Sequence, residues 1–188
     1  SGLWVPMAAS LCRMQIERLP GWTLPPEPEA QVAGLLARAF STDFGGRSYF
    51  QQRHHLRLVV RQTGRIIGHM ALLFRAVRLG VDLTDIAGLA DVATDPNQRG
   101  RGIAQALLHE AIAEARASQA AYFVLFGNAN LYSGNGFARQ INPLTYLDMP
   151  DAKTGSVKTE PAQELMVLSL RGQAWDTSAR LDLLGTLF

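Results

Sequence analysis

The sequence predicts an α/β protein of the α+β kind, with a mixed, mostly antiparallel central sheet and helices on both faces. Residues 66–79 follow a Thr63-Gly64 turn after the apolar stretch 56–61, as the second arm of a β-hairpin does. A helical pattern at 102–118 lies between the apolar stretches 83–94 and 122–126. Two strands joined by a helix are expected to be parallel neighbours with a right-handed crossover.

Composition indicates a globular protein, since hydrophobic residues make up 47% and charged residues 18% of a chain long enough for one domain. No apolar run approaches the roughly 20 residues of a membrane span. Residues 1–9 lack a basic region followed by an apolar stretch, so no secretory signal is expected. We therefore expect a cytoplasmic protein, with residues 1–9 as a disordered or vector-derived start and residues 10–188 as one domain.

Charge and cysteine content limit the partners. The net charge is only +2, and the arginines are dispersed without interleaved aromatic residues, so nucleic acid is not favoured. The single Cys12 cannot form an internal disulfide, and no Cys/His spacing indicates a metal site. The expected partner is a small molecule, with no nucleic acid and no membrane, and a homodimer is an open alternative.

The first third of the chain is expected to hold one strand and two helices. Residues 11–19 alternate loosely, as a strand does. The Pro-rich residues 20–28 are expected to exclude a helix, which then covers residues 29–40 with an apolar face at helical spacing. A polar, Gly-containing loop at 41–48 precedes a short second helix at 49–52.

The remaining elements follow from the same patterns. Residues 127–137 are expected to be irregular or briefly helical, and residues 165–170 to form the last strand. The polar stretch 142–161, which carries both lysines, is expected to be a long surface loop, with a substrate lid or a dimer contact as alternatives.

The turn before the helix at 102–118 is a candidate pyrophosphate site. A helix start has backbone N–H groups without intrahelical partners and the positive end of the helix dipole, so it attracts anions. Gly100 and Gly102 would let a phosphate approach the backbone closely, and Arg99 and Arg101 add positive charge.

Three phosphate-binding patterns compete for this turn. A Walker loop is excluded because no lysine precedes Lys153, and the dinucleotide pattern has Gln105 where it needs Gly or Ala. The sequence Arg99-x-x-Gly102-x-Ala104 after a strand resembles the Arg/Gln-x-x-Gly-x-Gly/Ala acyl-CoA motif of the GNAT superfamily of N-acetyltransferases. By itself, this stretch is equally consistent with an ordinary strand-to-helix turn.

A second motif strengthens the resemblance. Tyr132-x-x-x-Gly136-Phe137 is similar to the signature that follows the fifth strand of GNAT proteins. The expected order of strands and helices in this chain is also similar to that of the GNAT fold. Together with residues 165–170 and 187–188, the form Gly-Asn-x-x-x-Tyr beginning at Gly127 is similar to the bacterial YhbS-like subgroup.

Weaker resemblances concern the acceptor. Residues 39–44 and 66–71 are similar to stretches of aminoglycoside 2'-N-acetyltransferases, and the second stretch also resembles the nodulation N-acyltransferases. The aminoglycoside 2'-N-acetyltransferases carry a glutamate at the position of Ala90 and end in a Trp that this chain lacks. The nodulation enzymes lack the Tyr132 signature. An amino-sugar acceptor is therefore an alternative.

The resemblance implies an N-acetyltransferase that moves the acetyl group of acetyl-CoA directly to a primary amine of a small molecule, without a covalent enzyme intermediate. The fourth and fifth strands, here 83–94 and 122–126, would splay apart to admit the pantetheine arm. The Val92 N–H would stabilise the charge that develops on the thioester oxygen. The implied cofactor-binding residues are Val92, Thr94, Arg99, Gly100, Arg101, Gly102, Ile103, Ala104 and Asn128.

The resemblance also suggests catalytic roles. Tyr132 would protonate the departing thiolate, or alternatively only pack beneath CoA. Asp91, costly to bury without a partner, and His69 are candidate bases, although a lone His in an apolar strand is more often a hydrogen-bonded core residue. Asp85 is better explained as a solvated turn residue. Asp43 is a candidate for binding the cationic substrate or, equally, a loop or helix-cap residue.

Two further functions share these motifs. A non-catalytic acyl-CoA-binding regulatory module would use the same phosphate turn, although it has no need of the proton donor Tyr132. An acyltransferase that uses a longer acyl donor would differ only in the depth of its acyl pocket.

Overall fold

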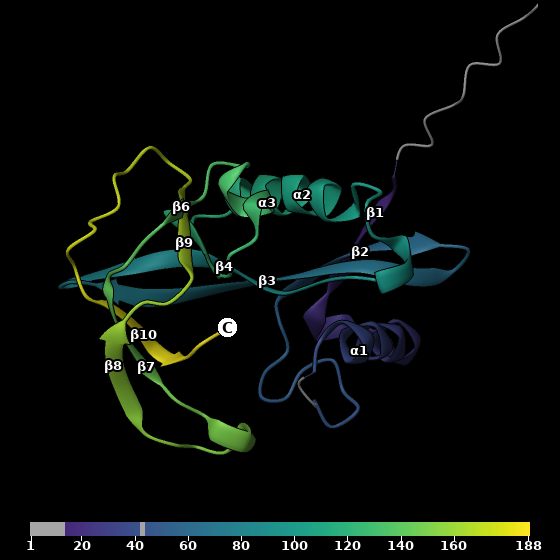
Figure 1. Ribbon diagram of the computed structural model, residues 1–188, viewed down its shortest axis with the longest axis horizontal. Helices are drawn as coiled ribbons and strands as arrows, with labels where there is room; N and C mark the ends of the chain where they lie inside the picture. The colour runs from purple at the N-terminus through teal and green to yellow at the C-terminus, as the bar shows by residue number, and fades with distance from the viewer. Residues whose placement is uncertain (1–13, 42–43) are drawn as a thin grey trace, which may run out of the picture.

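The computed structural model describes residues 14–41 and 44–188 (Figure 1). Cys12, Asp43 and the expected start at 1–9 lie outside the described residues. The helices are α1 (Pro26–Ala39), α2 (Ile103–Ala117) and α3 (Asn130–Ser133), with 3-10 turns η1 (Gly21–Thr23), η2 (Pro96–Gln98) and η3 (Pro150–Ala152). In this part of the chain, no helix has the length and apolar character needed to span a bilayer.

The strands form one curled, mixed sheet. They are β1 (Ile16–Pro20), β2 (Leu56–Gln62), β3 (Arg65–Leu79), β4 (Asp82–Thr94), β5 (Tyr122–Phe126), β6 (Ala138–Arg139), β7 (Pro143–Leu147), β8 (Val157–Pro161), β9 (Leu165–Ser169) and β10 (Leu181–Thr186). The order β6-β9-β5-β4-β3-β10-β7-β8 describes the main path, and β2 and β1 extend from β3. The β4–β5 and β10–β7 pairs are parallel, and the others are antiparallel.

Helices cover both faces of the sheet. Helices α2 and α3 lie above it in Figure 1, whereas α1 lies below, on the same side as the curled strands β7, β8 and β10. Helix α2 packs its buried face of Ile103, Leu107 and Ala111 against the largest core cluster. It comes very close to β3 at Gly68, where an added Cβ would collide with the side chain of Ile103.

The predicted fold class is confirmed, together with its central elements. The hairpin β2–β3, strand β4, helix α2 and strand β5 lie within a few residues of their expected bounds. Strands β4 and β5 are parallel, as the helix between them requires. These elements have strong local periodicity, so their types follow from the sequence.

Two predictions about the N-terminal third were wrong. Helix α1 begins at Pro26, within the stretch expected to exclude a helix, because proline is tolerated in the first helical turn, where its missing N–H has no intrahelical role. The expected second helix at 49–52 is absent, since residues 44–55 form turns and bends. Gly45 and Gly46 both adopt positive φ angles there, and Ser48 bonds to Glu29 of α1.

The prediction of a long loop at 142–161 was also wrong. Strands β7 and β8 form an antiparallel hairpin across this stretch, and β7 pairs in parallel with β10. Leu144 and Tyr146 are buried at alternate positions of β7, a two-residue period that was missed because polar residues surround it. Strand β9 matches the expected last strand, but β10 follows it.

Candidate active site

Strands β4 and β5 part after three residue pairs. The β4–β5 pairing covers only Ile86, Ala87 and Gly88, whereas β4 continues to Thr94. From residue 89 to residue 94, the edge of β4 that faces β5 has no strand partner. Backbone amides need hydrogen-bond partners, so this edge is suited to a ligand that itself carries amides.

The unpaired edge leads into an uncapped helix start. Gly102 is the N-cap of α2, has φ 76° and ψ 14°, and provides no side-chain cap. Gly100 has φ 78°, and a Cβ at either glycine would meet no atom within 4 Å. This turn therefore combines open space with backbone N–H groups that α2 cannot pair internally.

Positive charge lies beside this helix start. Arg99 is exposed and has no ion-pair partner in the described part of the chain, whereas Arg101 bonds to the side chain of Gln98. Buried Asp95 fixes the approach to the turn, because its Oδ1 accepts a 3.0 Å hydrogen bond from the Asn97 N–H. Its Oδ2 lies 3.4 Å from Arg38 Nη2 of α1.

Tyr132 lies on α3, directly after β5. Its side chain is 8% exposed, packs against Gly127 and forms an edge contact with Phe137 at 6.1 Å between ring centroids. Its hydroxyl forms no hydrogen bond to a described residue, and burial raises the pKa of this phenol. The phenol therefore stays protonated at neutral pH. Asn128 is exposed at the end of β5, where its amide donates a 2.9 Å hydrogen bond to Glu164.

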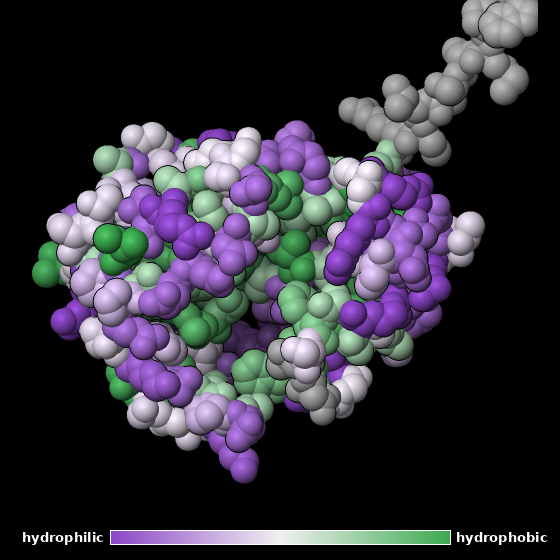
Figure 2. Space-filling model, viewed as in Figure 1, coloured by the Kyte–Doolittle hydropathy of each residue, from purple (hydrophilic) through white to green (hydrophobic). Residues whose placement is uncertain are grey.

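A cavity of about 600 Å³ lies on the α1 side of the sheet. Hydrophobic residues border the hollow that Figure 2 shows on this face of the molecule. The walls come from the segment 44–55, from β3 and β4, from β7 and from the residues of β10 and beyond. The lining residues that carry aromatic rings are Phe44, Tyr49, Phe50, His54, His55, Phe74, Tyr146 and Phe188, and those that carry charge are Arg53, Arg75, Asp91 and Asp148.

Asp91 lies in the wall of this cavity, on a bulge of β4. The β3–β4 register shifts between His69 and Ala71, so that Asp91 and Val92 together oppose Met70. Asp91 has φ 50°, in the left-handed region. Its Oδ2 lies 2.8 Å from His54 Nε2, and the two side chains are 17% and 15% exposed.

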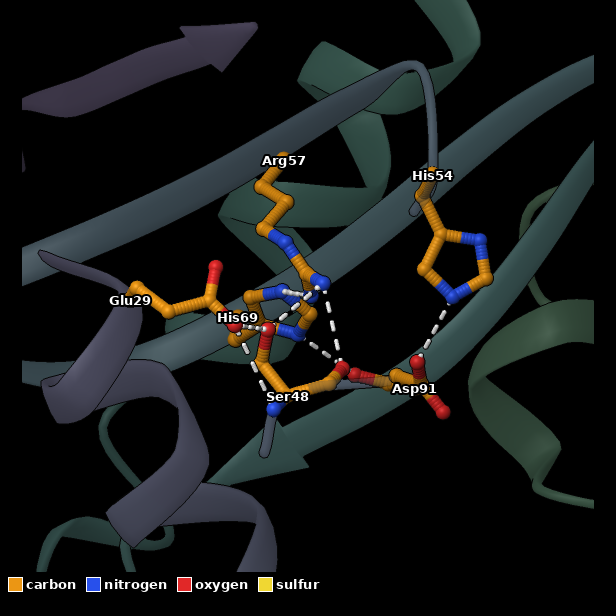
Figure 3. Close-up of polar contacts among 6 residues, drawn as sticks. All are labelled: Glu29, Ser48, His54, Arg57, His69 and Asp91. Carbon is orange, nitrogen blue, oxygen red and sulfur yellow. Dashed lines mark hydrogen bonds and ion pairs between the residues drawn. The ribbon is translucent and has the colours of Figure 1, made fainter. Parts of the chain in front are cut away.

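His69 lies behind the bulge and is fully buried. Its Nδ1 donates to the backbone carbonyl of Asp91 at 2.7 Å, and its Nε2 accepts from Arg57 Nη1 at 3.0 Å. Burial, reinforced by the neighbouring Arg57 charge, lowers the pKa of His69 to about 3. His69 is therefore neutral and supports the backbone of Asp91 (Figure 3).

Arg57 connects this bulge to helix α1. The guanidinium is 1% exposed and donates to the carbonyl and hydroxyl of Ser48 at 3.1 and 2.9 Å. The Ser48 hydroxyl in turn bonds to Glu29, which also pairs with Arg53 at 2.7 Å. Figure 3 shows the resulting network from Glu29 through Ser48, Arg57 and His69 to Asp91, with His54 bonded to the Asp91 carboxylate.

This network favours ionised carboxylates. Burial alone would raise the pKa of Asp91, but the hydrogen bond from His54 and the nearby positive charge of Arg57 lower it. For Glu29, burial is likewise outweighed by hydrogen bonds from Ser48 and by the charges of Arg53 and Arg57, so the pKa is lowered. Both side chains accept hydrogen bonds as anions at neutral pH.

The structure brings only some of the predicted site residues together. Asp91, Val92 and His69 meet at the bulge, whereas Asp85 is exposed near the start of β4. His54, Arg57 and Ser48 were not predicted from the sequence, because no motif marks them. The only signal was the His54-His55 pair before an apolar strand. In the described ranges, no group of three His, Cys, Asp or Glu residues is placed to hold a metal ion.

Comparison with known proteins gives a family match. A family model described as an acetyltransferase (GNAT) domain matches residues 24–139. YhbS from Escherichia coli, solved in complex with CoA, is 22% identical over 91% of this chain and 89% of its own, with a TM-score of 0.62. A GNAT family acetyltransferase from Brucella melitensis, in complex with acetyl-CoA, is 19% identical over 89% and 95% of the two chains, with a TM-score of 0.57.

A more distant structure is also similar. The ribosomal-protein-S18-alanine N-acetyltransferase from Escherichia coli is 19% identical over 85% of this chain and 97% of its own, with a TM-score of 0.52. No curated protein matches the sequence. At these identities, the solved structures establish a shared fold.

Proposed function

The chain belongs to the GNAT acetyltransferase domain family, and from this premise we propose that it is an N-acetyltransferase that transfers the acetyl group of acetyl-CoA to a primary amine of a small molecule. One observation carries the proposal. The unpaired edge of β4 leads to an uncapped helix start at one end and contacts the cavity at Asp91. A donor and an acceptor can therefore approach the same strand from different sides.

The residues of this chain fit an acyl-CoA. The backbone of Val92 and Thr94 would pair with the amides of the pantetheine arm, and Asn128 lies at the end of the opposite strand. The helix start would bind the pyrophosphate through Arg99, Gly100, Arg101, Gly102, Ile103 and Ala104. Acetyl-CoA supplies an activated thioester, so that no covalent enzyme intermediate is needed.

Two groups would then assist the transfer. The Val92 N–H would donate a hydrogen bond to the thioester oxygen as negative charge develops there. Tyr132 would give its proton to the departing thiolate. Because burial raises the pKa of this phenol, Tyr132 is protonated at neutral pH and has a proton to give.

The cavity is proposed to receive the acceptor amine. The resemblance suggests Asp91 or His69 for deprotonating this amine and Asp43 for binding it. The Arg and Asp side chains of the lining are already engaged: Arg53 with Glu29, Arg75 with the carbonyls of Leu183 and Thr186, Asp91 with His54, and Asp148 with Lys158. An aromatic wall with so few free carboxylates favours a monoamine on an apolar body over a polycationic amino sugar.

Two successive measurements test the proposal. Acetyl-CoA should raise the thermal unfolding midpoint of the protein. In an assay of free thiol released from acetyl-CoA, the enzyme should then show a higher kcat/KM for 2-phenylethylamine than for glucosamine or spermidine. A thermal shift without thiol release from any amine would favour the regulatory acyl-CoA-binding module. No thermal shift would contradict the cofactor assignment, and a longer acyl-CoA that outperforms acetyl-CoA would reassign the donor.

The phosphate turn gives a further prediction. Gly102→Val should weaken acetyl-CoA binding by about tenfold or more, because a β-branched residue resists φ 76° and its side chain occupies the open space before α2. Isothermal titration calorimetry measures the change in Kd.

Gly172→Val is the matched control. Gly172 also has φ 76°, and a Cβ added there would meet no atom within 4 Å, but Gly172 lies between β9 and β10. Both substitutions should cost about 1–2 kcal/mol of stability through the left-handed backbone. Equal Kd values for the two variants would remove the turn from the binding site.

A further inference from the structure

His54 occupies a distinctive position in the cavity wall. It precedes β2, and its Nε2 lies 2.8 Å from Asp91 Oδ2 on the bulge of β4. Both side chains line the cavity and are partly exposed to it. Asp91 is adjacent in sequence to Val92, the proposed hydrogen-bond donor to the thioester oxygen. The His54–Asp91 pair therefore lies where the acceptor amine and the thioester would meet.

The hydrogen bond to Asp91 fixes the state of the His54 ring. The ionised Asp91 carboxylate can only accept, so the neutral imidazole must carry its proton on Nε2. Nδ1 then holds a free lone pair. No described residue bonds to Nδ1, and this nitrogen lies on the side of the ring away from Asp91 (Figure 3). Since no buried side-chain nitrogen or oxygen in the described ranges lacks a partner, Nδ1 is accessible from the surface.

The other two candidates at the bulge lack such a free site. His69 is fully buried, and both its ring nitrogens are engaged, one with the Asp91 carbonyl and the other with Arg57. A proton added to Nε2 of His69 would face the guanidinium. Asp91 is surrounded by hydrogen-bond donors and positive charge, so its carboxylate is a weak base.

We infer that His54 is the general base of the acetyl transfer, with Asp91 as the positioning residue that orients its ring. This inference rests on the proposed function. An N–H bond of the acceptor ammonium breaks, and its proton passes to Nδ1 of His54. The freed nitrogen lone pair then forms the bond to the thioester carbonyl carbon. The C–S bond breaks as the CoA thiolate leaves and takes the proton of Tyr132, and the second proton of the nitrogen restores the Tyr132 hydroxyl. Asp91 stabilises the resulting imidazolium, as a carboxylate does when it hydrogen-bonds the other nitrogen of a catalytic histidine.

Several titratable and charged groups surround His54. Asp91 of β4 faces the ring directly, and fully buried His69 of β3 and Arg57 of β2 lie behind Asp91. Arg53 and His55 are its neighbours in the chain, and Arg53 is paired with Glu29 of α1. Among these groups, Asp91 is the one that bonds to the ring.

The first test combines His54→Gln with two acceptors. Its kcat/KM should fall by about 10²–10⁴-fold with an amine that is protonated at the assay pH. The loss should be much smaller with a related amine whose conjugate acid has a pKa below the assay pH, because that amine arrives without the proton. His109→Gln, an exposed substitution on α2, should match the wild type. Equal losses with both amines, or a wild-type pH-rate profile, would overturn the role of His54.

Asp91→Asn provides a second test. It should retain only partial activity, because an Asn amide can donate to the ring as well as accept from it and so no longer fixes one tautomer of His54. Wild-type activity of this variant would count against the pair. ¹⁵N NMR of the wild type provides a readout that needs no turnover. His54 should show the Nε2–H tautomer, and the Nδ1–H tautomer would refute the assignment. If the wild type releases thiol from acetyl-CoA and these tests still fail, only the role of His54 is refuted. If the wild type releases no thiol, the proposed function itself fails.

Discussion

Tyr132→Phe should lower kcat by about 10²–10⁴-fold while the Kd for acetyl-CoA stays close to the wild-type value. The substitution removes one oxygen and leaves the ring that packs on Gly127 and Phe137. The hydroxyl forms no hydrogen bond to a described residue, so little stability should be lost with it. Steady-state thiol release and calorimetric titration measure the two quantities separately.

Tyr122→Phe is the matched control on the neighbouring strand β5. Its hydroxyl donates a 2.9 Å hydrogen bond to the carbonyl of Ala174, outside the proposed site. Its removal should cost about 1 kcal/mol of stability without changing kcat. If Tyr132→Phe retained full turnover, Tyr132 would be left with the packing role beneath CoA.

The second large effect concerns the stability of the folded protein and involves the buried Arg57. Arg57→Met should lower the free energy of unfolding by about 3–5 kcal/mol, the cost of breaking a buried charge network by removing one partner. Arg57 holds the Ser48 carbonyl and hydroxyl and His69 Nε2, and each of these groups would lose a donor within the protein interior. Chemical denaturation followed by circular dichroism measures the change.

Arg61→Met is the control from the same strand. Arg61 pairs with Glu17 at 2.7 Å, but its side chain is 26% exposed. Pairs that water can reach contribute little, so a loss below about 1 kcal/mol is expected. Comparable losses for the two variants would show that the network around Arg57 does not stabilise the fold.

Arg57→Met should also affect the site. His69 bonds to the Asp91 carbonyl on one side and to Arg57 on the other, so its ring orientation depends on both. Loss of the guanidinium should loosen the bulge on which Asp91 and Val92 lie. A fall in kcat is therefore expected at temperatures where the variant is still folded.

The predictions from sequence succeeded where local pattern determines structure. Helix α2 and strand β5 have continuous periodicity, and the glycines around Arg101 mark the turn before α2. Predictions failed where an element is stabilised from a distance. Strand β7 is held between β8 and β10, and the segment 44–55 is tied through Ser48 and Arg53 to Glu29 of α1.

The sequence by itself determined the family, the fold class, the glycine-containing turn before α2 and the position of Tyr132 after β5, because each of these depends on residues close together in the chain. Only the tertiary structure placed His54 against Asp91, 37 residues away, and filled the space behind them with Arg57 and His69. That contact depends on the register of β2, β3 and β4 and on a single bulge. A shift of one residue in a strand reverses the direction of every side chain, and no motif in the sequence marks the bulge that introduces this shift between His69 and Ala71.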